Sequence, residues 1–230
     1  MRAVPALATA CVLAAAVGCS NDGDGGGATT VERGDAAVPA ALAGDGPTTE
    51  DHWHMAYAFN LCNPDTGEQQ LATVEGDKEI RDESGAPVGA EPKYAASGVH
   101  SHDDGVIHWH AISSQATGAN ATLGVFLDVY DVELTDSSLV FPADQGGGLS
   151  FSEGDTMCGD EPGQLSVTVW PDYADTERSV TVTEGLADIP VTRDDSVFVI
   201  SVAPEGAESA NRLGPRICLT SAHATAAEQR

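Results

Sequence analysis

Apolar and polar residues alternate along several short segments of the chain, which predicts a domain built mainly from β-strands. The alternation is cleanest over residues 165–169, as in a strand that buries one face and exposes the other. Gly, Pro and Asp clusters separate this segment from other strand-like runs at 138–141, 179–183 and 197–202. We therefore expect a mostly β fold of the α+β class, with antiparallel sheets.

One segment has helical periodicity instead. Its apolar residues follow the i, i+3, i+4, i+7 spacing of a single helical face, and they are Leu123, Phe126, Leu127 and Tyr130. Thr122 precedes them as a candidate N-cap, so the pattern predicts one short helix that ends before residue 133. Residues 63–96 show little periodicity, which predicts an extended loop or an insertion.

The most informative chemistry lies in three His-x-His pairs, which contain six of the seven histidines. Side chains at i and i+2 of a strand point to the same face, so each pair can offer two imidazoles to one ion. We interpret these residues as candidate metal ligands: His52 and His54, His100 and His102, and His108 and His110. The alternative is a metal-free imidazole cluster that responds to pH.

The last two pairs flank an Asp-Asp-Gly turn signal at 103–105, which predicts a β-hairpin. A three-residue loop with Gly105 in the left-handed conformation pairs His100 with His108 and puts all four imidazoles on one face. A two-residue turn pairs His100 with Trp109 and splits the imidazoles between the faces. We favour the three-residue loop, because the split register leaves neither face clearly apolar.

The ligand type narrows the choice of metal. Imidazole is a borderline ligand that suits zinc and copper best, whereas calcium and magnesium prefer oxygen. Nearby carboxylates could add an oxygen ligand or orient a ring through its second nitrogen, and the candidates are Asp51, Asp103 and Asp104.

The N-terminus predicts export. An apolar run at 3–17 leads to Gly18 and Cys19, the layout of a secretory signal peptide over residues 1–18. Residues 16–19 resemble the bacterial lipobox, with Ala16 where Leu is usual, so by resemblance Cys19 carries a lipid anchor on the outer face of the cell membrane. An ordinary signal peptide with a coincidental cysteine is the alternative.

Composition divides the remaining chain. Residues 19–50 are rich in Gly, Ala and Asp, which predicts a disordered tether. A folded β-rich domain is expected over 51–220, with a possible sub-boundary near 143–163 and a frayed tail at 221–230. The formal net charge is 10 − 36 = −26, which argues against nucleic-acid binding because such partners need a basic surface.

Three cysteines follow Cys19, and export predicts that two of them form a disulfide bond. We favour Cys62 with Cys158, and a bond between Cys158 and Cys218 is the alternative. Cys218 and His223 have the spacing of a blue-copper ligand loop, but no Met follows at the expected distance.

The motifs carry a resemblance. The Asp-His-Trp-His run at 51–54, the pattern His-x-His-x-x-Gly-x-Ile-His-x-His at 100–110 and the Cys-Gly-Asp-Glu-Pro-Gly run at 158–163 are similar to an uncharacterised family of secreted, lipoprotein-like actinobacterial proteins. That resemblance implies no particular activity. Residues 163–204 resemble a small β-grasp module, which implies a β-grasp-like C-terminal half.

Three functions are therefore open. The favoured one is a membrane-tethered extracytoplasmic protein that captures, stores or delivers copper or zinc. A zinc-dependent hydrolase or lyase at the same histidines is the second, and a metal-free adhesion or protein-interaction module is the third. The chain has no nucleophile elbow, no phosphate-binding Gly-rich loop and no His-Glu-x-x-His motif.

Overall fold

A computed structural model describes residues 29–31, 39–175, 178–205 and 207. The predicted signal peptide, Cys19, most of the tether, Cys218, His223 and the predicted tail lie outside these residues. Within them, no helix is long and apolar enough to cross a membrane.

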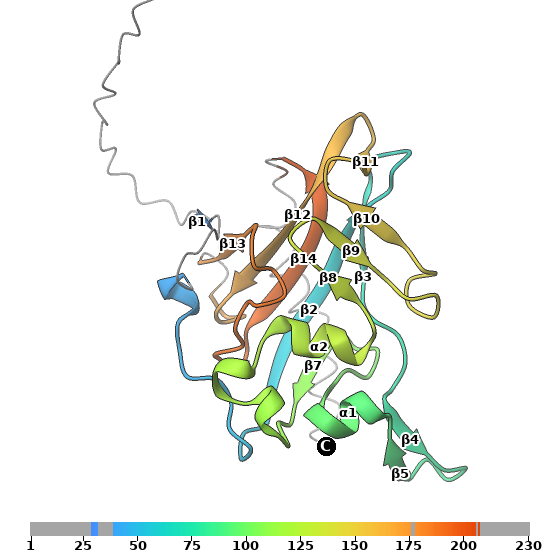
Figure 1. Cartoon of the computed structure of the whole chain (residues 1–230), viewed down its shortest axis with the longest axis vertical. Coiled ribbons are helices and arrows are strands. Elements are labelled where there is room, and N and C mark those ends of the chain that lie inside the picture. Colours follow the sequence, from blue (N-terminus) through green and yellow to red (C-terminus); the bar gives the residue numbers. More distant parts are fainter. Residues whose placement is uncertain (1–28, 32–38, 176–177, 206, 208–230) are drawn as a thin grey trace, which may run out of the picture.

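One large mixed sheet organises the domain (Figure 1). Its strands run in the order β1 (Thr29–Val31), β13 (Val180–Val182), β12 (Glu161–Trp170), β14 (Val197–Pro204), β2 (Trp53–Cys62), β7 (Val106–Trp109) and β6 (Val99–His100). β3 (Gln69–Ala72) adds to β2, and β11 (Met157–Cys158) adds to β12. The predicted β-rich class is confirmed, although β14 pairs with β2 in parallel, as β1 does with β13.

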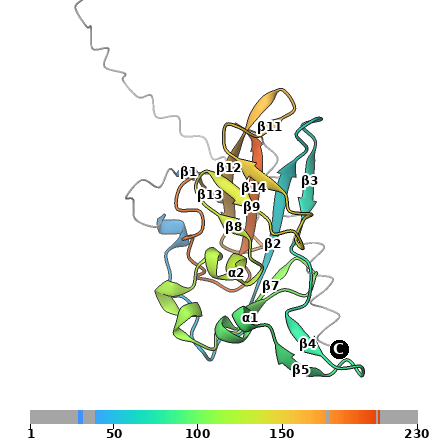
Figure 2. The same ribbon diagram turned by 45° about the vertical axis from the view of Figure 1, so that its right-hand side comes forward.

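Smaller elements surround this sheet. β8 (Glu133–Leu134), β9 (Ser138–Val140) and β10 (Ser150–Ser152) form a three-stranded sheet, and β4 (Glu79–Arg81) pairs with β5 (Pro87–Ala90). The α-helices are α1 (Pro92–Ser97) and α2 (Leu123–Val129), and the 3-10 turns are η1 (Ala40–Leu42), η2 (Ser114–Ala116) and η3 (Gly118–Asn120). Figures 1 and 2 show α1 and the β4–β5 hairpin beyond the end of the sheet where β7 lies.

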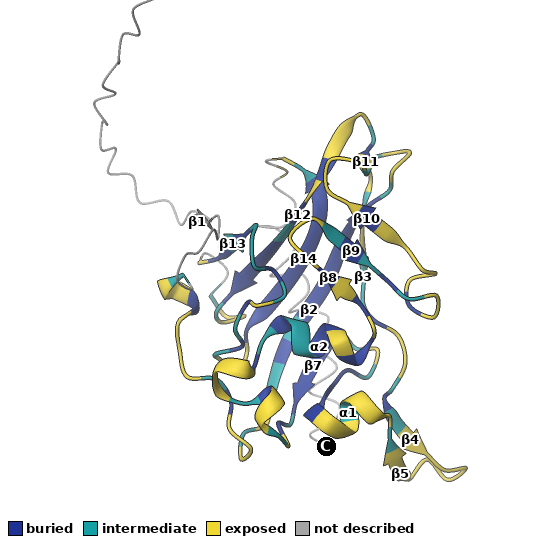
Figure 3. Cartoon of the chain, in the orientation of Figure 1, coloured by how far each residue is buried: buried dark blue, intermediate teal, exposed yellow. Residues whose placement is uncertain are grey.

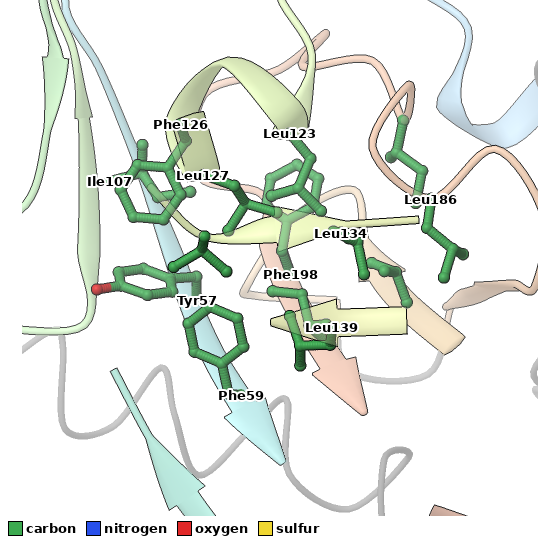
Figure 4. Packing of buried hydrophobic residues seen from close by; sticks show 14 of the residues in the cluster. Tyr57, Phe59, Ile107, Leu123, Phe126, Leu127, Leu134, Leu139, Leu186 and Phe198 are labelled. Carbon is green, nitrogen blue, oxygen red and sulfur yellow. The ribbon is translucent and has the colours of Figure 1, made fainter. Parts of the chain in front are cut away.

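The main core lies between the large sheet and α2. Alternate residues of β2 face it, and the fully buried Tyr57 ring packs edge-on against Phe126 of α2, with ring centroids 4.7 Å apart (Figure 4). The inward residues of β12 and β14 extend the same layer. Figure 3 shows these central strands buried while the β4–β5 hairpin is exposed. Burial of this apolar face is the main stabilising term of the fold.

The predicted helix is confirmed as α2. Its four apolar positions are at most 1% exposed, as the spacing requires. The Thr122 side chain forms no cap hydrogen bond, because tertiary contacts satisfy the first amides instead. The N–H of Leu123 donates to the Ile189 carbonyl, and that of Gly124 donates to the Ala187 carbonyl.

Residues 63–96 are more regular than the sequence indicates. They contain β3, the β4–β5 hairpin and most of α1, a second helix that periodicity did not predict. α1 ends at Ser97, and its C-cap is Gly98, whose φ of 80° is left-handed. A Cβ at this position would lie 1.9 Å from the His110 carbonyl oxygen, so only glycine lets β6 approach β7 this closely.

Cys62 and Cys158 form a disulfide bond, which is the pair that the sequence analysis favours. It joins the end of β2 to β11, across a sequence separation of 96 residues. Residues 163–204, which resemble a β-grasp module, contribute β12, β13 and β14 to the same sheet as β2. Upstream of residue 51, Leu42 is buried and its carbonyl accepts a hydrogen bond from the Thr192 hydroxyl.

Candidate metal centre

The hairpin that carries two histidine pairs has the favoured register. β6 and β7 are antiparallel, with His100 opposite His108 and Val99 opposite Trp109. Gly105 is left-handed at a φ of 73°, as the three-residue loop requires, and Asp103 is also left-handed at 62°. The two-residue turn is therefore excluded.

β2 brings the third pair to the same place. β2 and β7 are antiparallel, with His54 opposite His108 and Trp53 opposite Trp109. His52 and His110 directly adjoin the ends of these strands, and their ring centroids are 3.7 Å apart. Residues opposite each other in a sheet point to the same face, so His54, His100 and His108 share one side of three neighbouring strands. Ring contacts join His52, His102 and His110, which lie just outside those strands, to the same group.

The rings form one continuous cluster. The His102 centroid lies 4.6 Å from that of His108, and the His54 centroid lies 4.8 Å from it. The tryptophans between the histidines point the other way, as alternation predicts. Trp109 is fully buried and its Nε1 donates to the Ala116 carbonyl at 2.8 Å, so this residue anchors the core beneath the cluster.

Three of the histidines have ligand nitrogens close enough to hold one ion. One nitrogen each from His52, His54 and His108 lies within 4.8 Å of the others. Tetrahedral zinc ligands at about 2.0–2.1 Å are roughly 3.3 Å apart, so a modest ring rotation closes the set. His52 is exposed and His108 is buried, so a bound ion would face solvent beside His52 and be enclosed by protein beside His108.

Of the three predicted carboxylates, Asp104 forms a hydrogen bond with an imidazole. Asp104 Oδ2 lies 3.2 Å from His108 Nε2, so a proton on Nε2 is favoured and Nδ1 is left with its lone pair for a metal. Asp103 instead accepts from the Gly76 N–H, and Asp51 accepts from the N–H and hydroxyl of Thr48.

Two further residues at the site come from the segment without periodicity. Asp77 Oδ1 lies 3.4 Å from His102 Nδ1, and the Tyr94 ring packs on that of His100 at 4.4 Å between centroids. Sequence reasoning missed both, because no pattern in residues 63–96 fixes their register to the hairpin. Asp77 follows Glu-Gly in a chain that is rich in acidic residues, so nothing in the sequence marks it as part of a site.

Burial keeps part of the cluster uncharged. Loss of solvent, followed by repulsion from His102 and His108, lowers the pKa of His100 to about 3. Loss of solvent, followed by repulsion from His52 and His108, lowers the pKa of His110 to about 4. At neutral pH these rings therefore hold lone pairs, which is the form that binds a metal.

Burial raises the pKa of the Asp104 carboxyl, but hydrogen bonds from the His108 ring and the Val106 N–H outweigh that effect and leave the pKa lowered. A charged carboxylate thus lies beside the buried end of the cluster. The arrangement combines uncharged nitrogen ligands with a negative group that attracts cations.

Comparison of the chain with protein-family models, curated proteins and solved structures finds no match. The resemblance to secreted actinobacterial proteins stays a prediction. Any functional conclusion has to come from the histidine cluster itself.

Proposed function

We propose that this chain is a membrane-tethered extracytoplasmic protein that binds a transition metal, copper or zinc, for capture, storage or delivery. One observation carries the proposal: the rings of the three His-x-His pairs, which lie on or next to β2, β6 and β7, form one cluster. Solubility alone does not require six clustered imidazoles, which repel one another when they are protonated.

The donor set favours this class of metal. Nitrogen ligands on three strands suit zinc and copper, and the Asp104 contact resembles the carboxylate–histidine arrangement that orients metal-bound imidazoles. The rigid sheet holds the backbone of His54 and His108 in register, so less ordering is required when an ion binds.

The cellular placement rests on the sequence. A signal-like run, a lipobox-like Cys19 and a polar linker are the parts that a surface-anchored metal carrier needs. Mass spectrometry of the protein purified from bacterial membranes tests this part: a diacylglycerol-modified N-terminal Cys19 supports it, and an unmodified N-terminus contradicts it.

Elemental analysis by plasma mass spectrometry tests metal binding. The full chain, purified with a histidine-free tag and without chelator, is expected to contain roughly one ion of copper or zinc per chain. His54→Ala combined with His108→Ala should remove most of it. His223→Ala, which removes the one histidine outside the three pairs, is the control and should retain it.

A second candidate function follows from the ligand count. His52, His54 and His108 would supply three nitrogens and leave a fourth position for water, which is the coordination of hydrolytic zinc. Turnover of ester or amide substrates by the zinc-loaded chain, lost in His108→Ala, would favour this function over transport or storage.

A further inference from the structure

The cluster contains more imidazoles than one ion uses. A tetrahedral ion takes four ligands, and His52, His54 and His108 already supply three. His100 and His102 lie on the other side of His108, at ring-centroid distances of 5.2 and 4.6 Å. These two residues require an explanation of their own.

His100 and His102 face each other through their ε nitrogens. The two Nε2 atoms are 3.0 Å apart and form a hydrogen bond, so one of them carries the shared proton in the metal-free protein. His100 is only 2% exposed, and no hydrogen-bond partner exists for its Nδ1 in the part of the chain that the structure describes. A ring buried for packing alone would be better replaced by an apolar one, because an unpaired buried polar atom costs about 1–3 kcal/mol.

Asp77 sets the protonation pattern of this pair. Its Oδ1 lies 3.4 Å from His102 Nδ1, which favours a proton on that nitrogen and a lone pair on Nε2. The carboxylate is itself fixed, since Oδ1 accepts the Glu79 N–H at 2.9 Å and Oδ2 accepts Arg81 Nε at 3.1 Å. The β4–β5 hairpin thus aims the His102 lone pair at His100.

An ion that replaces the shared proton can bind both nitrogens, and that proton then moves to Nδ1 of His100, which has no hydrogen-bond partner among the described residues. Two nitrogens at about 2.0–2.1 Å from an ion and 3.0 Å from each other subtend roughly 95° at it. That angle fits neighbouring positions of square-planar or octahedral coordination, as in Cu²⁺ or Ni²⁺, and is narrower than the roughly 109° of tetrahedral zinc.

We propose that His100 and His102 form a second metal position, with Asp77 as its positioning residue, so that the cluster holds two ions. This inference rests on the proposed metal-binding function and specifies its capacity. The second position has fewer protein nitrogens and lies near another cation, so it binds more weakly and prefers Cu²⁺ to Zn²⁺.

Calorimetric titration of the metal-free full chain with CuCl₂ tests the proposal. Two equivalents are expected, with the second at least 10-fold weaker than the first. Asp77→Asn should weaken the second step by 10- to 100-fold and leave the first unchanged. Glu83→Gln, a matched change at an exposed acid on the same hairpin, should alter neither step.

Electron paramagnetic resonance distinguishes ligand positioning from a structural effect. The second Cu²⁺ signal should show nitrogen hyperfine coupling, disappear in His100→Ala/His102→Ala, and be partly recovered in Asp77→Glu relative to Asp77→Asn. Near-UV circular dichroism of Asp77→Asn, whose change lies outside the core, verifies the fold.

The outcomes separate the two proposals. A single ion that survives in His100→Ala/His102→Ala overturns the second position and leaves the proposed function standing. A single ion lost in that variant shows one shared site, which also overturns the second position. Absence of any copper or zinc binding by the unmodified chain overturns both proposals.

Discussion

The two faces of β2 and β7 are built for different purposes. On one face, Met55, Tyr57, Ile107 and Trp109 are fully buried against the helical layer. On the other, His54 and His108 belong to an imidazole cluster in which burial lowers two pKa values. The first face stabilises the fold through apolar burial, whereas the second gives up stability to hold uncharged nitrogen ligands in register.

The two faces should therefore respond differently to mutation. Changes on the core face or to the disulfide bond should alter the free energy of unfolding without altering the metal affinity of the folded molecule. Changes on the imidazole face should do the reverse. The two readouts, unfolding free energy without metal and metal affinity at neutral pH, therefore have to be measured on the same variants.

The largest loss of stability is expected when the disulfide bond is removed. Cys62→Ser/Cys158→Ser opens a loop of about 97 residues, and we expect a loss of about 5 kcal/mol in the free energy of unfolding. Urea unfolding at pH 7 measures it. Metal binding by the folded fraction should persist, since the bond lies at the far end of β2. Loss of metal binding by a variant that remains folded would contradict this separation of stability from metal affinity.

Adjacent residues of β2 offer the sharpest contrast. Met55→Ala empties a fully buried site and should lower the free energy of unfolding by about 2–5 kcal/mol. His54→Ala keeps the backbone N–H that donates to Asp194 and should change this energy by less than about 1 kcal/mol. Urea titrations in chelator measure both. Equal losses would contradict the division between the faces.

A smaller effect is expected from the carboxylate that orients His108. Asp104→Asn should weaken the tighter metal step by about 10- to 100-fold, because the His108 tautomer is no longer fixed. Competition with a chromophoric chelator measures the affinity. Asp103→Asn is the matched control: Asn tolerates the left-handed backbone, and Asp103 contacts the Gly76 N–H. A similar loss in both variants would reject the orienting role.

Stability should also depend on pH. The pKa values of His100 and His110 fall from 6.5 to about 3 and about 4 on folding, so below pH 6.5 the unfolded chain binds protons that the folded chain does not. The metal-free protein should therefore lose stability as the pH falls from 6.5 towards 4. Urea midpoints at pH 7 and pH 5 measure this. His110→Gln should reduce the difference, and an unchanged slope would contradict the assignment.

The sequence predicts much of this arrangement because the relevant signals are local. Period-two alternation indicates β12, helical spacing indicates α2, and the left-handed Gly105 sets the hairpin register. The antiparallel pairing of β2 with β7 is a non-local contact, and the sequence supports it only through the shared His-Trp-His pattern. Asp77 and α1 could not be predicted, because tertiary packing rather than periodicity places them at the cluster.

The central claim is that imidazoles of the three pairs bind the metal. X-ray absorption spectroscopy of the copper- or zinc-loaded full chain at pH 7 tests it most directly. The account predicts a first shell of nitrogen or oxygen at about 2.0 Å with the outer-shell scattering of at least two imidazole rings, and loss of that scattering in His54→Ala/His108→Ala. A shell without imidazole scattering, or one unchanged in the double variant, would contradict it.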